Sequence, residues 1–420
     1  MGRCIAIIFI GLLTLVAAGC SGARETDQIA FVMVVGVDRN ESNKLEFTFQ
    51  IAVPRSFGAG NSSGPKDVKE ATELLTVEAE SFAEARDLAN STVARILSLA
   101  HVKGFVLGEK VAREGVEAVL PALTRFREYR GSMFLMVVRE GTAKEFITNN
   151  QPKLEVSPAR YLETIMASST ESSNYLPTTI HQYYVRLKNG GGEPYVTLVA
   201  SRESKESEHR KSKQSIDITG DYSAGDLPRS GSGNPSEFLG VAVFRGDKMV
   251  GHLDNKQTRG LTLMEGKFER GFFVVADPLV AGETVNLEVE QGGKPRIKAS
   301  MIDGKARFLI DVFIEAEITA ISSGVHYEAG GYREQLEQQV SKVVAEDIRS
   351  ALAVTQPLGS DVGGLSCRLW PKFDTYRELG RVDWVELYRN ADVDVSVVTK
   401  IRRTGFMTKT SPDHLNRQEE

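Results

Sequence analysis

The residue types that carry out chemistry in enzymes are scattered along this sequence. Ser63 and Lys66 have the spacing of a serine nucleophile and a lysine base on one helical turn, but they lie in a Gly- and Pro-containing stretch without a partner motif. None of the six histidines has a second histidine three to five residues away, which argues against a zinc site. The glycines of KNGGGEP lack the Lys-Ser/Thr of a phosphate loop. We therefore predict a protein that is not an enzyme, with no catalytic, metal-binding or cofactor-binding residues.

Paired acidic residues near the end of the sequence have a simpler explanation than a cation site. Asp392 and Asp394 alternate with valines, so a strand would place both carboxylates on one face and the valines on the other. Arg402 and Arg403 end the same segment. We interpret these charges as a solvated strand face, with contact to a partner as the alternative. Three glutamates, Glu78, Glu80 and Glu84, are likewise interpreted as surface residues.

Cys20 is the residue with the most specific predicted chemistry. An uncharged apolar run of residues 4–18 precedes Gly19-Cys20, which suits a signal peptide and is short for a helix that must cross roughly 30 Å of hydrocarbon. Small residues before a cysteine resemble the bacterial lipobox, in which the thiol takes a diacylglyceryl group and the chain is cut just before the cysteine. Ala17 stands where leucine is usual. We predict a signal peptide over residues 1–19 and lipidation of Cys20. The alternative is an ordinary secretory signal with an incidental cysteine.

The amino-acid composition is typical of a globular protein. The chain has 420 residues, 41% hydrophobic and 25% charged, with a net charge of −5. Domains usually have about 100–200 residues, so two or three are expected. The charge does not suggest nucleic acid as a partner, since that needs a concentrated basic surface. If Cys4 leaves with the signal and Cys20 carries lipid, only Cys367 remains, which excludes an internal disulfide framework.

The hydrophobic pattern predicts an α+β fold of three consecutive domains, each a mixed or antiparallel sheet with helices. Ser81 and Glu84 predict a helix start with a capping box. Residues 284–291 and 294–302 predict a hairpin across Gly292-Gly293. Residues 332–354 predict an amphipathic helix whose inward stripe is Leu336, Val340, Val343, Val344, Ile348 and Leu352.

The expected organisation is a short lipid-anchored tether, three domains and a tail. The polar segment 201–236 within the middle domain is too poor in apolar residues to pack. The boundaries we predict are 20–27 for the tether, 28–150, 151–280 and 281–405 for the N-terminal, middle and C-terminal domains, and 406–420 for a flexible tail.

Three parts of the sequence together resemble the Ger(x)C family, the lipoprotein C subunits of nutrient germinant receptors in endospore-forming bacteria. They are GCSGARETDQIAFVMVVGVDR, then GVAVFRGDKMVGHLDNKQTRG, and then PLGSDVGG with the later DVDVSVVTKIRRTG. Their order and spacing cover nearly the whole mature chain. The sequence departs from the family at Ser21-Gly22, where Trp-Asp is common, and at His252, where an aromatic residue is frequent. A further aromatic residue is frequent after Asp361-Val362 and is missing here.

The resemblance implies a non-enzymatic protein of three α+β domains in a complex with two integral-membrane subunits, of A and B type. It also implies a place at the outer face of the spore's inner (cell) membrane, where the lipid on Cys20 would enter the bilayer. Two other classes stay open. A lipid-anchored solute-binding protein would capture a nutrient itself between two lobes, and an anchored wall-modifying enzyme would need the catalytic set that the sequence lacks.

Overall fold

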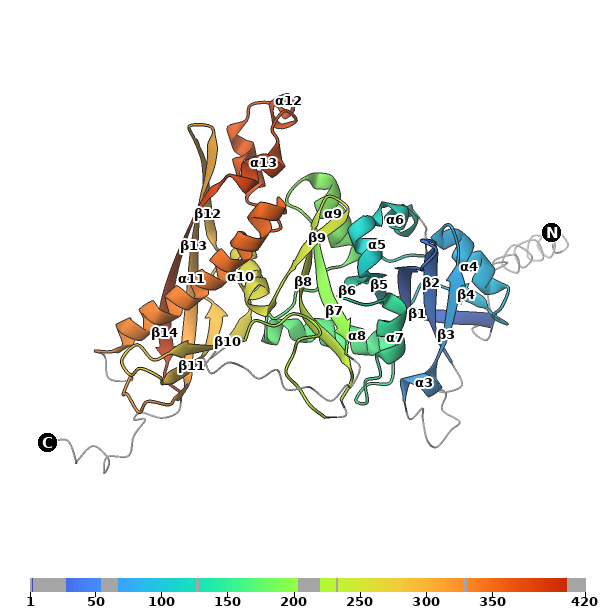
Figure 1. Cartoon of the computed structure of the whole chain (residues 1–420), viewed down its shortest axis with the longest axis horizontal. Helices are drawn as coiled ribbons and strands as arrows, with labels where there is room; N and C mark the ends of the chain where they lie inside the picture. The colour runs from blue at the N-terminus through green and yellow to red at the C-terminus, as the bar shows by residue number, and fades with distance from the viewer. Residues whose placement is uncertain are drawn as a thin grey trace.

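Two β-sheets lie side by side along the long axis of the molecule in the computed structural model (Figure 1). The structure describes residue 2 and residues 28–53, 67–125, 128–202, 220–231, 233–327 and 331–405. The mixture of helices and sheets is the α+β class that the hydrophobic pattern predicts. Within these ranges no helix is both long enough and apolar enough to cross a bilayer.

The first sheet has nine strands in the order β3-β2-β1-β5-β6-β7-β8-β9, with β4 beside β1. Its centre is parallel, from β1 through β5 and β6 to β7, and its two ends are antiparallel. The strands are β1 (Ile29–Arg39), β2 (Leu45–Ala52), β3 (Thr72–Glu78), β4 (Ile96–Ser98), β5 (Gly104–Gly108), β6 (Phe134–Val138), β7 (Tyr195–Ser201), β8 (Ser236–Arg245) and β9 (Lys248–Leu253).

Helices cover both faces of this sheet, because alternate residues of the central strands are apolar on both sides. Val35 and Phe105 belong to the core beneath α4, α5, α6 and α9, whereas Val34 and Val106 belong to a second core beneath α7 and α8. The helical segments are α3 (Val68–Ala71), α4 (Phe82–Asn90), α5 (Glu109–Glu114), the 3-10 helix η2 (Val116–Ala118), α6 (Leu120–Arg125), α7 (Ala143–Asn149), α8 (Pro158–Ala167), the 3-10 helix η3 (Ser168–Glu171) and α9 (Ile180–Asn189).

The second sheet has five strands built around the 17-residue strand β13. β12 and β11 pair antiparallel with successive halves of β13, and β14 pairs parallel along its other edge. The strands are β10 (Arg270–Ala276), β11 (Thr284–Gln291), β12 (Arg296–Ile302), β13 (Lys305–Ile321) and β14 (Asp392–Arg403). Helices α10 (Asn255–Glu265) and α11 (Arg333–Leu358) pack on one face, and η4 (Ser366–Lys372), α12 (Tyr376–Leu379) and α13 (Trp384–Arg389) precede β14.

The apolar stripe predicted for α11 is confirmed in the core of the second sheet. Leu336, Val340, Val344, Ile348 and Leu352 are buried, and Val343 is half-buried. Gly260 of α10 allows this helix to pack closely against α11, since a Cβ atom at this position would lie 2.3 Å from the carbonyl oxygen of Asp347. The two helices can therefore approach to backbone contact at this point.

The predicted hairpin between residues 284–291 and 294–302 is wrong. β11 and β12 do not pair with each other, because β13 pairs with both and lies beside them. The tight turn is instead Asp303-Gly304, where both residues have positive φ and Ile302 pairs with Lys305. Asp-Gly is the typical pair for a two-residue hairpin turn, and this local signal outweighs Gly292-Gly293.

The sheets continue across the boundaries that the sequence predicts. Residue 150 falls between β6 and β7, which pair within one sheet, and β10 pairs with β11 across residue 280. The division into three domains at these boundaries stays a prediction.

Candidate functional site: a charged sheet face and a buried junction

The residues predicted to carry chemistry do not converge on one place. Cys20, Ser63 and Lys66 lie outside the described residues. Asp392 and Asp394 lie on the exposed face of β14 and alternate with half-buried valines, as predicted. The carboxylate of Asp394 pairs with Arg307 at 2.8 Å, so it is part of a surface ion pair. Within the described ranges, no group of three or more His, Cys, Asp or Glu residues could hold a metal ion.

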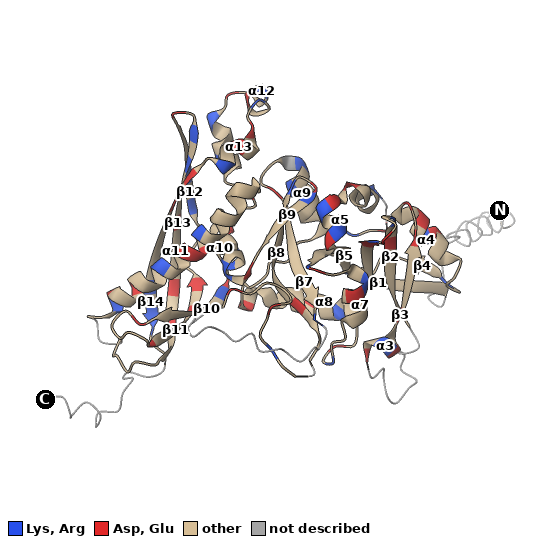
Figure 2. Ribbon diagram, in the orientation of Figure 1, with Lys and Arg blue, Asp and Glu red and all other residues tan. Residues whose placement is uncertain are grey.

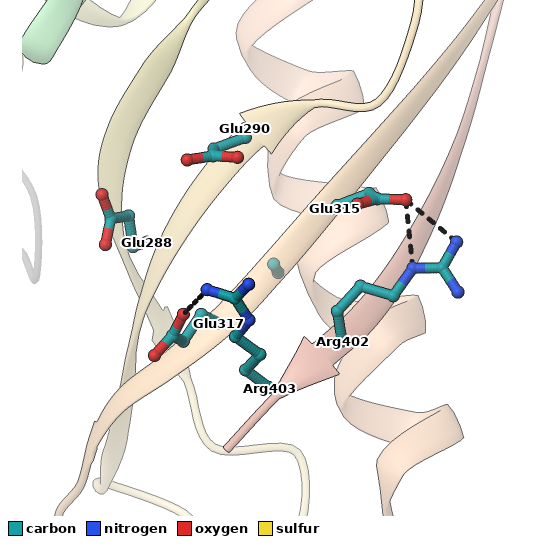
Figure 3. A pocket seen from close by; sticks show the side chains of 7 residues that line it. Glu288, Glu290, Glu315, Glu317, Arg402 and Arg403 are labelled. Carbon is teal, nitrogen blue, oxygen red and sulfur yellow. Dashed lines mark hydrogen bonds and ion pairs between the residues drawn. The ribbon is translucent and has the colours of Figure 1, made fainter. Parts of the chain in front are cut away.

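Four glutamates meet on the face of the second sheet that lies opposite α11. Glu288 is directly across from Glu317, and Glu290 is directly across from Glu315, on the neighbouring strands β11 and β13. Like charges in opposed positions destabilise a sheet unless other groups offset them. We name this region the charged face; a shallow hollow of about 130 Å³ there is lined by Glu288, Glu290, Glu315, Ala316, Glu317, Arg402 and Arg403 (Figure 3).

Arginines on the two flanking strands offset these carboxylates. From β14, Arg402 pairs with Glu315 at 2.9 Å and Arg403 pairs with Glu317 at 3.7 Å. From β10, Arg270 pairs with both glutamates of β11 at 3.1 Å. Basic and acidic residues consequently lie close together on this sheet (Figure 2).

The charged face suits recognition better than catalysis. Its ion pairs are at least partly exposed, and such pairs each contribute only about 0–1 kcal/mol to folding. A partner could therefore replace them at little cost in stability. The sequence signal for the face was present as alternating glutamates in NLEVEQ and IEAEI, but their pairing depends on strand register, which the sequence does not show.

Asp38, near the end of the first family-like stretch, holds two elements of the fold together. Its buried carboxylate accepts hydrogen bonds from the backbone N–H groups of Ala143 at 2.7 Å and Lys144 at 2.9 Å, at the start of α7. Burial raises the pKa of Asp38, although these two hydrogen bonds oppose the shift. Gly108 on the neighbouring strand must lack a side chain, since a Cβ there would lie 2.1 Å from the carboxylate. Asp38 thus fixes α7 to the centre of the first sheet.

A buried ionic cluster joins the two sheets. The side chain of Glu265, at the end of α10, is 7% exposed and pairs with Arg186 of α9 at 2.8 Å. Its second carboxylate oxygen accepts a hydrogen bond from the Tyr195 hydroxyl at 2.6 Å and pairs with Lys267 at 3.0 Å. Burial opposes ionisation, but Arg186 and Lys267 hold the pKa of Glu265 below its ordinary value. We name these four residues the junction cluster.

The family-like stretch PLGSDVGG closes the same junction. Gly359 ends α11 in the left-handed conformation, and the Ser360 hydroxyl donates to the carbonyl oxygen of Phe244 in β8 at 2.5 Å. The buried carboxylate of Asp361 accepts the backbone N–H groups of Leu365 and Ser366. Arg186 donates to the carbonyl oxygen of the next residue, Val362, so the loop and the junction cluster share one guanidinium group.

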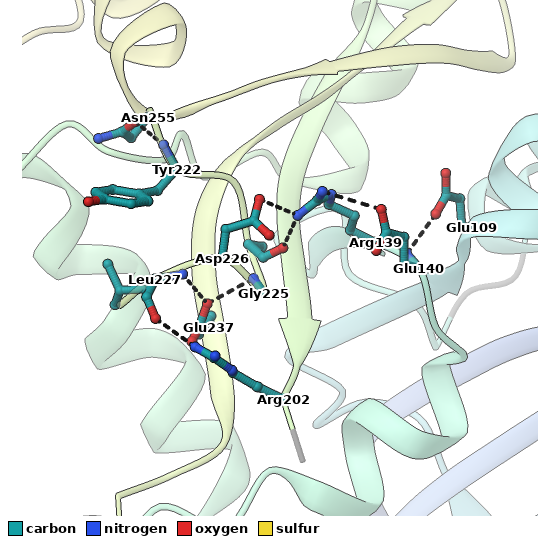
Figure 4. Close-up of polar contacts among 11 residues, drawn as sticks. Glu109, Arg139, Glu140, Arg202, Tyr222, Gly225, Asp226, Leu227, Glu237 and Asn255 are labelled. Atoms are coloured by element: carbon teal, nitrogen blue, oxygen red, sulfur yellow. Dashed lines mark hydrogen bonds and ion pairs between the residues drawn. The ribbon is translucent and has the colours of Figure 1, made fainter. Parts of the chain in front are cut away.

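The described part of the predicted polar loop packs on the first sheet, contrary to the expectation that it could not pack. Polar contacts hold part of this segment: the buried carboxylate of Glu237 accepts the backbone N–H groups of Gly225 and Leu227 at 2.8 and 3.3 Å (Figure 4). Arg139, which directly follows the central strand β6, also donates to the carboxylate of Asp226 at 2.7 Å. Apolar contacts contribute as well, since Ala224 is buried in the core of the first sheet and Tyr222 packs against that core.

Two family models match the chain one after the other. The model of the spore germination protein N-terminal domain matches residues 22–201, and the model described as spore germination B3/GerAC like, C-terminal, matches residues 239–405. Because both halves are present in order and together span most of the sequence, the chain belongs to the GerAC-like, or Ger(x)C, family of spore germination proteins.

Individual relatives extend over nearly the same length. The chain is 20% identical over 400 residues to the putative spore germination protein YfkR of Bacillus subtilis (strain 168), covering 95% of this chain and 96% of the relative. It is 21% identical over 411 residues to spore germination protein KC of the same organism, covering 96% of each chain. A solved crystal structure of the GerBC protein matches with a TM-score of 0.53 and 20% identity, covering 88% of this chain and 96% of that chain. This likeness confirms the α+β fold.

Proposed function

We propose that this protein is a lipid-anchored, non-catalytic subunit of a spore germinant receptor and is needed for nutrient-triggered germination. The observation that carries the proposal is the ordered match of both family models along the chain. In the proposal, Cys20 carries the lipid and holds the body at the outer face of the spore's inner membrane. Two integral-membrane subunits, of A and B type, are its partners.

The geometry supports a binding role in two ways. Family-like residues such as Asp38, Ser360 and Asp361 are buried and join elements of the fold, which suits a rigid body rather than an open reaction centre. The charged face, in contrast, is exposed and built from ion pairs that a partner could replace. We propose the charged face as the contact surface for a receptor subunit.

Charge reversal tests the contact surface. The double variant R402E/R403E places two more acidic groups beside four glutamates and should reduce co-purification of the membrane subunits at least tenfold. Arg377→Glu, at an exposed position in α12, is the matched control and should leave co-purification unchanged. Equal recovery with the double variant and the control would exclude the charged face as the contact.

Germination of spores tests the function as a whole. Deleting the protein should abolish the nutrient response of its own receptor, while germination by routes that bypass receptors continues. Cys20→Ala should weaken the response through loss of the anchor, with both membrane subunits quantified in each strain. A deletion strain that responds like the parent, without a related subunit to substitute, would refute the proposal.

One observation favours a second candidate, a lipid-anchored solute-binding protein. A hollow of about 560 Å³ beside the charged face is lined by Gly292, Gly293, Lys294, Arg296, Asp311, Val312, Phe313, Ser396 and Val398. Its charged and aromatic side chains could hold a small zwitterionic or aromatic nutrient. Calorimetric titration of the purified protein with the nutrient decides between the candidates: tight binding that Asp311→Ala removes would favour direct capture.

A further inference from the structure

An apolar groove lies between α4 and α6, on the first sheet. Its volume is about 300 Å³, and its lining is mainly apolar, with arginines at two positions: Phe82, Ala83, Arg86, Pro121, Ala122, Arg125 and Tyr129. This volume is at the lower limit for ligand pockets, which favours a short apolar segment of a larger molecule over a complete polar nutrient.

The groove is close to the point where the described chain begins. Arg86 in its wall donates to the carbonyl oxygen of Leu97 in β4 at 3.2 Å, and Leu97 pairs with Ala30 at the start of β1. Figure 1 shows α4 and β4 together at one end of the molecule, which is therefore the end where the first described strand begins. Cys20 is eight residues before Gln28, so even a fully extended tether spans only roughly 26–29 Å. A lipid on Cys20 would therefore keep this end of the body near the bilayer.

Two aliphatic side chains of α4 and β4 are exposed: Leu88 by 43% and Ile96 by 40%. Helical spacing places Leu88 on the flank of α4 away from the groove, whereas Ile96 is next to Leu97, which Arg86 of the groove wall contacts. The charge of Arg86 is offset by Glu128 at 2.8 Å, whereas exposed Arg125 makes no ion pair with any described residue. Glu84 and Asp87 of α4 are acidic, so the groove region as a whole attracts an anionic membrane surface only weakly. A direct ion pair between Arg125 and a lipid phosphate would therefore contribute more to binding than overall charge.

We propose that the α4–α6 groove takes an acyl chain of an anionic phospholipid from the membrane that holds the Cys20 lipid. The apolar walls would cover part of the chain, and Arg125 at the rim would pair with the lipid phosphate. Exposed Ile96 of β4 would contact the same leaflet. This inference rests on the anchoring in the proposed function and adds a second, non-covalent contact that fixes the orientation of the body.

Depth-dependent quenching tests the proposal on the full mature protein. A tryptophan is placed in the groove wall by Ala83→Trp, and the protein is reconstituted in vesicles of 70% phosphatidylcholine and 30% phosphatidylglycerol with brominated acyl chains. Native Trp370 and Trp384 lie in the second half of the chain, and the parent protein gives their background. Ala320→Trp, at an exposed position at the end of β13, is the matched control.

We expect brominated phosphatidylglycerol to quench the Ala83→Trp signal at least twice as strongly as the Ala320→Trp signal. Adding Arg125→Glu should lower the quenching to the control level while the protein still floats with the vesicles. Ala122→Trp, on the opposite wall, gives the same readout if Ala83→Trp disturbs folding.

Each contrary outcome has a distinct meaning. Flotation without excess quenching of either groove tryptophan would overturn the groove proposal and leave the anchor intact. Equal quenching by brominated phosphatidylcholine would overturn the pairing of Arg125 with an anionic headgroup. A mature protein that does not float would overturn both the groove and the lipid anchor.

Discussion

Glu337 of α11 binds the outer edge of the second sheet through the backbone N–H of Ile401, which donates to its carboxylate at 2.9 Å. The other oxygen of the carboxylate pairs with Lys400 at 2.9 Å. Ser341 and Arg349, further along the helix, bond the backbone N–H of Thr399 and the carbonyl oxygen of Val395. Edge strands otherwise offer unpaired backbone groups to other chains. The side chains of α11 thus cover part of the edge of β14.

Removing this cover should both destabilise the fold and promote self-association. Glu337→Ala leaves a buried N–H without its acceptor, which typically costs about 1–3 kcal/mol. Chemical denaturation and light scattering measure the two effects. Gln338→Ala, at the exposed neighbouring position, should change neither, and an unchanged Glu337→Ala protein would contradict the assigned role.

The backbone contact at Gly260 predicts a large effect of one methyl group. Gly260→Ala should force α10 away from α11 and lower the free energy of unfolding by about 1–3 kcal/mol, as overpacked cores do. Gly293→Ala is the control, because no atom lies within 4 Å of a Cβ placed there. Equal stability of the two variants in urea denaturation would show that the helices are not in contact at Gly260.

Breaking the junction cluster should be costly because it leaves a buried charge. Glu265→Gln removes the partner of Arg186, and loss of one member of a buried pair typically costs about 3–5 kcal/mol. Arg186→Met alone should cost a similar amount, and the double variant should cost less than the sum. A double-mutant cycle by urea denaturation measures this coupling, and strictly additive effects would contradict a direct pair.

The raised pKa of Asp38 predicts how pH changes its contribution. Because the folded state binds the proton more tightly than the unfolded state, the contribution is present below the ordinary pKa of 3.8 and is lost as pH rises through the folded pKa. Asp38→Asn does not titrate, so its deficit in stability relative to the parent should be largest in acid and become smaller toward neutral pH.

Urea denaturation from pH 3 to pH 7 at constant ionic strength measures this difference. Asp374→Asn, at an exposed position between η4 and α12, provides the baseline for a change of charge alone. A deficit that increases with pH would mean that the fold lowers the pKa of Asp38, contrary to its burial.

Local patterns could be predicted from the sequence, and pairings between distant segments could not. The alternation of Asp392 and Asp394 with valines and the stripe of α11 depend on periodicity alone, and both are confirmed. Ser81 also begins α4 as predicted, since its hydroxyl accepts the N–H of Glu84. The Glu84 carboxylate, however, accepts the N–H of Glu80 rather than that of Ser81.

The missed features depend on contacts between segments far apart. Asp38 is 105 residues from Ala143, and Arg186 is 79 residues from Glu265, so neither partner could be identified from spacing. The hairpin across Gly292-Gly293 failed for a related reason, because β11 and β12 each pair with a different half of β13, which comes later in the sequence. Lipidation of Cys20 stays a prediction.

The junction between the sheets has a mechanical consequence. Side chains of α9, α10, β7 and the loop after α11 meet there, and Glu265 at their centre is almost completely buried. Bending the body at this point would require exposing an ion pair and the apolar core that Tyr195 shares with the second sheet. A force on the charged face would therefore move both sheets together as one rigid body, so it would change the orientation of the molecule rather than its shape.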